Sequence, residues 1–298
     1  MEIHEFDDTT ILADLSRRLN EKNVSIREME FMTKKLLALN EQAREAESIK
    51  SKFLSLIKNE FNNPMSSLLN LASALVKCTE QEQFERITRM LNGELLRLDF
   101  QLKNIFATTE IEEGQIGSHY SYISFKAVFE DVTSSLKYAI EDKNLSVEVL
   151  HCDTDVFASD ASKIYLILLN LLSNACEYSH CDSKIGAYLR KDDKFIYLYV
   201  EDAGEGINVK HAMEIYDRFA KFISKNRRSS GLGLGLSVVR GLTESLDGEV
   251  SFKSVENNTI FCVKLPIVTG EVTSGAIDAE TFLFDDFSNN AGEEMREL

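Results

Sequence analysis

Three glycines, each two residues apart, lead directly into an apolar helical pattern. Gly231, Gly233 and Gly235 are followed by Leu236 and by further apolar residues at helical spacing. Glycine lets the backbone approach a ligand closely, and the N–H groups at the start of a helix attract phosphate. The pattern is typical of a phosphate-binding turn, although a flexible turn before a helix would explain it equally well.

Two upstream motifs favour the phosphate-binding interpretation. Asn170 and Asn174 are four residues apart in a pattern that predicts a helix over 161–178, so both lie on one helix face. Asp202-Ala-Gly-Glu-Gly206 follows a predicted strand and places a carboxylate beside two glycines, Gly204 and Gly206. Together these motifs predict a nucleotide-binding site to which the rest of the chain is attached.

Composition limits the function classes. The chain has 298 residues, a length that suggests about two domains, and a net charge of −16, which argues against nucleic acid and anionic membrane as partners. Five scattered cysteines predict neither a disulfide framework nor a zinc site. The acidic start does not resemble a signal peptide, and no apolar run has the length of a membrane span. We therefore expect a cytoplasmic protein.

The amino-terminal region predicts long helices. Residues 12–75 contain one proline and no glycine, and residues 1–44 are assigned to a coiled-coil signalling helix. An amphipathic helix on a globular core is the alternative. A polar turn at 77–81 and a second apolar stripe make residues 45–115 a helical hairpin, two copies of which form a dimeric four-helix bundle. The coiled-coil seam consists of Leu12, Leu15, Leu19, Ile26, Met29 and Leu36.

Residues 116–268 combine helices with strands. The patterns predict strands at 120–125 and 145–150, hairpins over 185–200 and 248–265, and helices at 128–140, 161–178 and 234–246. Helices that alternate with paired strands indicate an α/β sandwich with a mixed sheet. The acidic tail, residues 269–298, is expected to be disordered, with docking of its aromatic cluster at 281–287 as the alternative.

The order of the motifs resembles the catalytic core of bacterial sensor histidine kinases. The segments 170–174, 202–206, 216–219 and 231–236 follow a helical hairpin in the order and spacing of that family. The resemblance covers about residues 45–266 and implies the Bergerat ATP-binding fold. It also implies ATP and Mg²⁺ as cofactors, a homodimer formed through the hairpin, and a response regulator or partner histidine kinase as partner.

Roles in the nucleotide site follow from this resemblance. Asn174 is the implied Mg²⁺ ligand, since an amide oxygen is a hard ligand. Asp202 is the implied acceptor for the adenine amino group, and Phe219 is the implied hinge of a lid. The complete set of implied nucleotide contacts is Asn170, Asn174, Tyr178, Asp202, Gly204, Gly206, Phe219, Gly231, Gly233, Gly235 and Leu236.

Two departures from the family bear on activity. The family's acceptor histidine is replaced by Asn59, although Glu60 and Asn63 fit the acceptor box. An amide nitrogen is delocalised and cannot accept a phosphoryl group as imidazole does. The family's lysine after the second asparagine is replaced by Glu177, whose charge would repel a triphosphate unless the side chain turns away.

Three functions therefore stay open. We favour an ATP-responsive signalling protein that lacks autophosphorylation at the usual site and acts on a partner kinase or response regulator. The second is an active kinase that phosphorylates a partner or another of its own residues. The third is a phosphatase or scaffold for a response regulator, in which Asn63 orients water. An ATPase like Hsp90 or MutL is a more distant alternative, because residues 45–112 have the pattern of a kinase hairpin.

Overall fold

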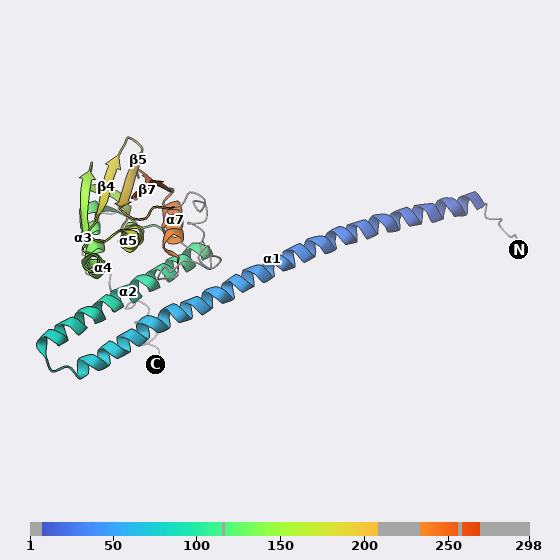
Figure 1. Cartoon of the computed structure of the whole chain (residues 1–298). Coiled ribbons are helices and arrows are strands. Elements are labelled where there is room, and N and C mark those ends of the chain that lie inside the picture. The colour runs from blue at the N-terminus through green and yellow to red at the C-terminus, as the bar shows by residue number, and fades with distance from the viewer. Residues whose placement is uncertain (1–7, 115–116, 208–232, 256–257, 269–298) are drawn as a thin grey trace, which may run out of the picture. The chain divides into compact units, whose positions relative to one another are not determined.

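The structure, a computed structural model, describes residues 8–114, 117–207, 233–255 and 258–268. Contacts within the chain divide it into two units, residues 1–58 and 59–298. The described part of the first unit belongs entirely to helix α1 (Asp8–Val76), drawn in blue in Figure 1. None of the helices in the described ranges has an apolar stretch long enough to cross a membrane.

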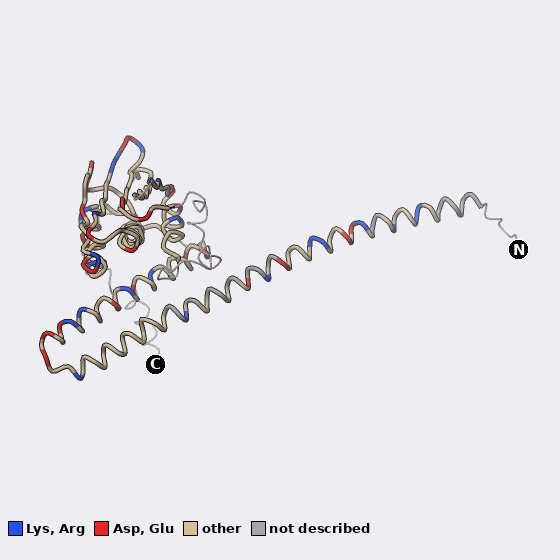
Figure 2. Tube along the Cα trace, in the orientation of Figure 1, with Lys and Arg blue, Asp and Glu red and all other residues tan. Residues whose placement is uncertain are grey.

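The predicted seam of α1 is exposed in the single chain. The side chains of Leu15, Leu19, Ile26, Met29 and Leu36 are between 46% and 67% exposed. Charged residues are interspersed with them along the helix, as Figure 2 shows. A helix of this kind gains stability mainly by packing its apolar stripe against another surface.

The second unit begins with a helical hairpin. The last part of α1 is followed by the turn at residues 77–80 and by helix α2 (Gln81–Glu113). Helix α2 ends at Gly114, whose φ of 67° is left-handed and whose N–H donates to the carbonyl oxygen of Glu110. Glycine adopts this conformation without steric cost and therefore suits the end of α2.

A five-stranded sheet follows, in the order β2-β4-β5-β7-β6. Strands β2 and β4 are parallel, while β4–β5, β5–β7 and β6–β7 are antiparallel. The predicted fold class, a helical region followed by an α/β domain with a mixed sheet, is confirmed. The strands are β2 (Ser146–Cys152), β4 (Lys184–Lys191), β5 (Phe195–Asp202), β6 (Glu249–Val255) and β7 (Asn258–Pro266).

Helices cover one face of this sheet. Strands β5 and β7 alternate strictly between buried and half-exposed residues, so each has one face toward the core. Helix α5 (Ala161–Tyr178), predicted with the same bounds, and helix α7 (Gly235–Ser245) pack against each other, and Figure 1 shows α3 and α5 below the strands. The apolar side chains of α5 are almost fully buried, and each of the buried leucines and isoleucines contributes about 1.5–3 kcal/mol.

Two predictions of secondary structure were wrong. The helix expected over 128–140 is two helices, α3 (Phe125–Ser135) and α4 (Lys137–Asp142), separated at Leu136. A strand that the sequence pattern missed, β3 (Val156–Asp160), pairs antiparallel with β1 (Tyr120–Ser124). Strand β3 is only five residues long and runs directly into α5, so no turn signal marks its end.

Candidate functional site

One face of helix α5 carries three of the predicted site residues. Asn170, Asn174 and Tyr178 are spaced four residues apart, so they follow one another along the helix. Exposure increases along this face, from 1% at Asn170 through half-buried Asn174 to 45% at Tyr178. The face therefore runs from the core of the unit to its surface.

The start of helix α7 lies against the buried end of this face. Gly233 has a left-handed φ of 69°, and α7 begins at Gly235. A Cβ atom on residue 235 would lie 2.7 Å from Oδ1 of Asn170, so only glycine fits without movement of the asparagine. Leu236 is half-buried in the first turn. The N–H groups of a helix start are therefore placed next to α5, where an anion is favoured.

The Asp202 loop lies against the opposite end of α5. Ser179, just after the helix, forms an isolated antiparallel bridge with Gly204, and the N–H of His180 donates to the carbonyl oxygen of Ala203 at 3.2 Å. A Cβ atom on residue 204 would lie 2.5 Å from the carbonyl oxygen of Tyr178. Gly206 has a left-handed φ of 76°. Glycine at these two positions lets the loop close on the helix end.

Asp202 presents a buried carboxylate in this loop. Its side chain is 6% exposed, and Oδ1 accepts the N–H of Gly204 at 3.0 Å. Burial raises the pKa of this carboxyl to about 6, an effect that the hydrogen bond from Gly204 opposes and the charge of Glu201 reinforces. The carboxylate has lost much of its hydration and would gain from a further N–H donor.

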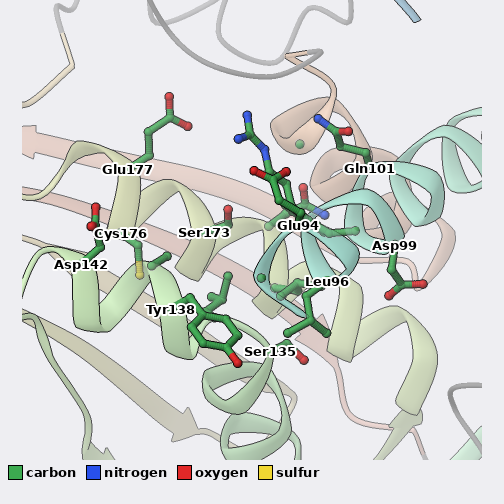
Figure 3. Close-up of a pocket in the computed structure, with 18 of the residues that line it drawn as sticks. Glu94, Leu96, Asp99, Gln101, Ser135, Tyr138, Asp142, Ser173, Cys176 and Glu177 are labelled. Carbon is green, nitrogen blue, oxygen red and sulfur yellow. The ribbon is translucent and has the colours of Figure 1, made fainter. Parts of the chain in front are cut away.

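A cavity of about 900 Å³ opens beside α5. Its walls come from the second-unit part of α1, from α2 to α5, and from residues 233–235 at the start of α7. Asn170 and Asn174 both line it. Figure 3 shows Ser173, Cys176 and Glu177 on α5 with Tyr138 nearby. Asp202 and Gly204 lie outside its lining, so the cavity includes the Asn170–Gly235 end of the site but not the Asp202 loop.

Comparisons with known proteins agree with this geometry. Residues 159–269 match the family described as histidine kinase-, DNA gyrase B-, and HSP90-like ATPase. Sensor protein SrrB of Staphylococcus aureus (strain NCTC 8325 / PS 47) is 23% identical over 224 residues, which cover 74% of this chain and 38% of SrrB. Residues 159–269 therefore belong to a histidine-kinase-like ATPase domain. The chain spans little more than a third of the length of this curated relative.

Solved structures of histidine kinases share the fold. Histidine kinase AdeS of Acinetobacter baumannii is 21% identical, with a TM-score of 0.50 over 70% of this chain and 98% of AdeS. Full-length ShkA, solved in complex with AMPPNP, is 19% identical, with a TM-score of 0.53 over 73% of this chain and 46% of ShkA. These likenesses extend over more of the chain than residues 159–269 and show a shared fold.

The position of the family's lysine, here Glu177, has a basic neighbour that the sequence did not indicate. Glu177 is exposed, and in Figure 3 its side chain extends away from Cys176 and Tyr138. Nζ of Lys143, at the end of α4, donates to the main-chain oxygens of Glu177 at 2.5 Å and Ser179 at 3.0 Å. Lys143 is more than 30 residues away in sequence, so no local motif pointed to it.

Asn170 also has a partner outside the sequence motifs. Its Nδ2 donates to Oδ1 of Asn104, on α2, and to the carbonyl oxygen of Leu166, both at 2.8 Å. Asn104 is itself buried. Asn170 therefore joins the hairpin to the ATPase domain, and its predicted contact with ATP stays a proposal.

The acceptor box lies on α1 at the start of the second unit. Asn59 and Glu60 are helical, but their side chains are outside the described part of the chain, so the predicted outward orientation of Asn59 stays a prediction. Asn63 is exposed and Pro64 is buried. Phe219 and Gly231, the predicted lid hinge and first glycine of the turn, also lie outside the described residues.

The buried carboxyl of Asp202 predicts a specific pH dependence of stability. Its folded pKa of about 6 exceeds the ordinary 3.8, so the folded protein retains a proton that the unfolded chain loses as pH rises from about 4 to 6. The higher proton affinity of folded Asp202 adds to the free energy of unfolding. This stabilisation is complete below pH 4 and is lost as pH rises through 6, by about 3 kcal/mol at most. We expect Asp202→Asn to become progressively more stable than the wild type across this range in denaturant unfolding. A difference in the free energy of unfolding that stays constant with pH would contradict the raised pKa of Asp202.

Proposed function

We propose that this chain is an ATP-responsive signalling protein of the histidine kinase type that does not phosphorylate the family's usual acceptor position. The observation that carries the proposal is the position of α5 between the two ends of the site. Gly235 lies against Asn170 at one end, and the Asp202 loop pairs with Ser179 at the other. A nucleotide would lie along the helix face between them, with phosphates and base at opposite ends.

The residues at both ends fit Mg-ATP. The buried carboxylate of Asp202 would accept the adenine amino group, which supplies a further N–H donor. The start of α7 would bind the phosphates, and Asn174 would contribute an amide oxygen to Mg²⁺. The described residues contain no group of three or more acidic, histidine or cysteine side chains that could hold a metal. Mg²⁺ would therefore depend on phosphate oxygens and water for its other ligands.

Calorimetric titration with Mg-ATP tests this function directly. We expect binding with one site per chain and a large loss of affinity when Mg²⁺ is chelated, because the metal neutralises the phosphates beside exposed Glu177. An absence of heat and of thermal stabilisation at millimolar Mg-ATP would remove the ATP-responsive part of the proposal.

A histidine at the family's acceptor position is expected to make the protein phosphorylate itself. Asn59→His places an imidazole nitrogen with an available lone pair at the family's acceptor position, so we expect labelled protein on incubation with γ-labelled ATP and Mg²⁺. The label should be acid-labile, as phosphohistidine is. Asn59→Gln is the control, because it retains an amide and should stay unlabelled.

An unlabelled Asn59→His protein that still binds Mg-ATP would contradict the idea that only the acceptor is missing. Glu177→Lys in the same background then identifies the second defect. Recovery of labelling would show that the second defect is repulsion between Glu177 and the triphosphate.

The dimer and the partner are also part of the proposal. The apolar seam of α1 is exposed in the single chain, and a second copy would bury it. The hairpin of α1 and α2 supplies the bundle through which the family dimerises. We propose that the dimer acts on a response regulator or on a partner histidine kinase.

A further inference from the structure

We propose that the turn between α4 and β2, through Lys143 and Asn144, is the positioning element for the base-binding loop of Asp202. The inference rests on the proposed binding of ATP and adds to it the residues that determine selectivity for adenine. Neither residue belongs to the sequence motifs of the nucleotide site. Four hydrogen-bonded steps connect them to the carboxylate.

The first step joins Lys143 to the end of α5. Its ammonium group donates to the main-chain oxygens of Glu177 and Ser179, at 2.5 and 3.0 Å. Carbonyl groups in the last turn of a helix lack partners within the helix and carry partial negative charge. Helix α5 has no basic residue of its own in its last turn. Lys143 supplies that cation from another element and holds the main chain where the helix ends.

The second step locks two turns together. Asn144, with φ of 50°, and Asp182, with φ of 60°, both adopt the left-handed conformation that asparagine and aspartate tolerate. Nδ2 of Asn144 donates to Oδ1 of Asp182 at 2.7 Å, and the N–H of Asp182 donates to the carbonyl oxygen of Lys143 at 2.9 Å. The turn after α4 therefore fixes the turn between α5 and β4.

The last two steps lead to the carboxylate. Ser179, held by Lys143, bridges to Gly204, and His180 donates its N–H to the carbonyl oxygen of Ala203. Gly204 in turn donates its N–H to Oδ1 of Asp202 at 3.0 Å. Apart from the side-chain bond between Asn144 and Asp182, each link after Lys143 is a main-chain contact or a bond to Asp202 itself. A displacement at Ser179 would therefore move the Asp202 loop.

Two roles are open to Lys143, and the nucleotide that it affects distinguishes them. Lys143 lines the cavity beside α5 that also includes Gly235, but its ammonium group is bonded to the Glu177–Ser179 main chain, which adjoins the Asp202 loop. A residue that positions the base should affect recognition of the adenine amino group. A residue that replaces the lost lysine at the phosphates should affect all nucleoside triphosphates equally.

The test compares ATP with purine riboside triphosphate, which lacks the amino group, by calorimetry on Lys143→Met, Lys143→Arg and wild type. The wild type should prefer ATP by about tenfold, because the analogue leaves a buried charged acceptor without its donor. Lys143→Met should weaken the binding of ATP about tenfold and reduce the preference for ATP over the analogue below about threefold. Lys143→Arg should retain most of this preference. Lys137→Met is the control, since Lys137 is exposed at the start of α4 and pairs with Glu141 at 3.9 Å.

The outcomes separate the alternatives. An unchanged preference in Lys143→Met, whether or not both affinities fall, overturns the positioning role and leaves the proposed function intact. Wild-type protein that binds neither nucleotide overturns both. If Lys143→Met does not fold, Asn144→Gly replaces it, because glycine suits the left-handed backbone and only the bond to Asp182 is lost. Asn144→Gly should reduce the preference about twofold to threefold, and an unchanged preference overturns the inference.

Discussion

Replacing Asp202 with asparagine is expected to weaken binding of Mg-ATP about 10- to 100-fold, because a buried charged acceptor becomes a neutral amide. The same change should stabilise the nucleotide-free protein at neutral pH, where the ionised carboxylate of Asp202 is buried at a cost. Calorimetry and thermal unfolding on the same samples measure both effects. Opposite signs for binding and stability are typical of a residue retained for function.

Glu205→Gln is the control for this prediction. Glu205 is exposed and lies in the same loop, so it loses a charge of the same sign without loss of the buried acceptor. Its affinity for Mg-ATP should stay within about twofold of the wild type. Equal effects of the two variants would show that net charge, and not hydrogen bonding by Asp202, controls affinity.

Gly204→Ala is expected to damage both the fold and the site. The new Cβ atom would lie 2.5 Å from the carbonyl oxygen of Tyr178 and 2.8 Å from Oδ1 of Asp202. Because the first of these is a backbone atom, the loop must move away from α5. We expect a loss of about 1–3 kcal/mol in the free energy of unfolding, measured with denaturant. Binding of Mg-ATP should weaken about tenfold as Asp202 is displaced.

Gly117→Ala makes the same chemical change without the clash. A Cβ atom on residue 117 would meet no heavy atom of the described chain within 4 Å, and Gly117 does not have a left-handed φ. Its stability and affinity should therefore match the wild type. A Gly204→Ala protein that behaves like Gly117→Ala would contradict the tight closure of the Asp202 loop on α5.

Local sequence was sufficient for the elements with strong patterns. Helix α5 has the predicted bounds because a continuous apolar stretch with helical spacing defines it, and strands β5 and β7 alternate as their sequences indicate. The four-residue spacing of Asn170, Asn174 and Tyr178 is enough to place them on one helix face. The glycines of the Asp202 loop likewise marked a close approach of the backbone.

Contacts between distant segments could be decided only by the tertiary structure. Strand β3 is short and is defined by its pairing with β1, which no local pattern encodes. The partners of the site, Lys143 at the end of α5 and Asn104 beside Asn170, come from segments 36 and 66 residues away. Periodicity and motifs report what a residue does within its own element. A hydrogen bond between two elements depends on how those elements pack, and that is why the sequence indicated the nucleotide motifs but not the residues that hold them in place.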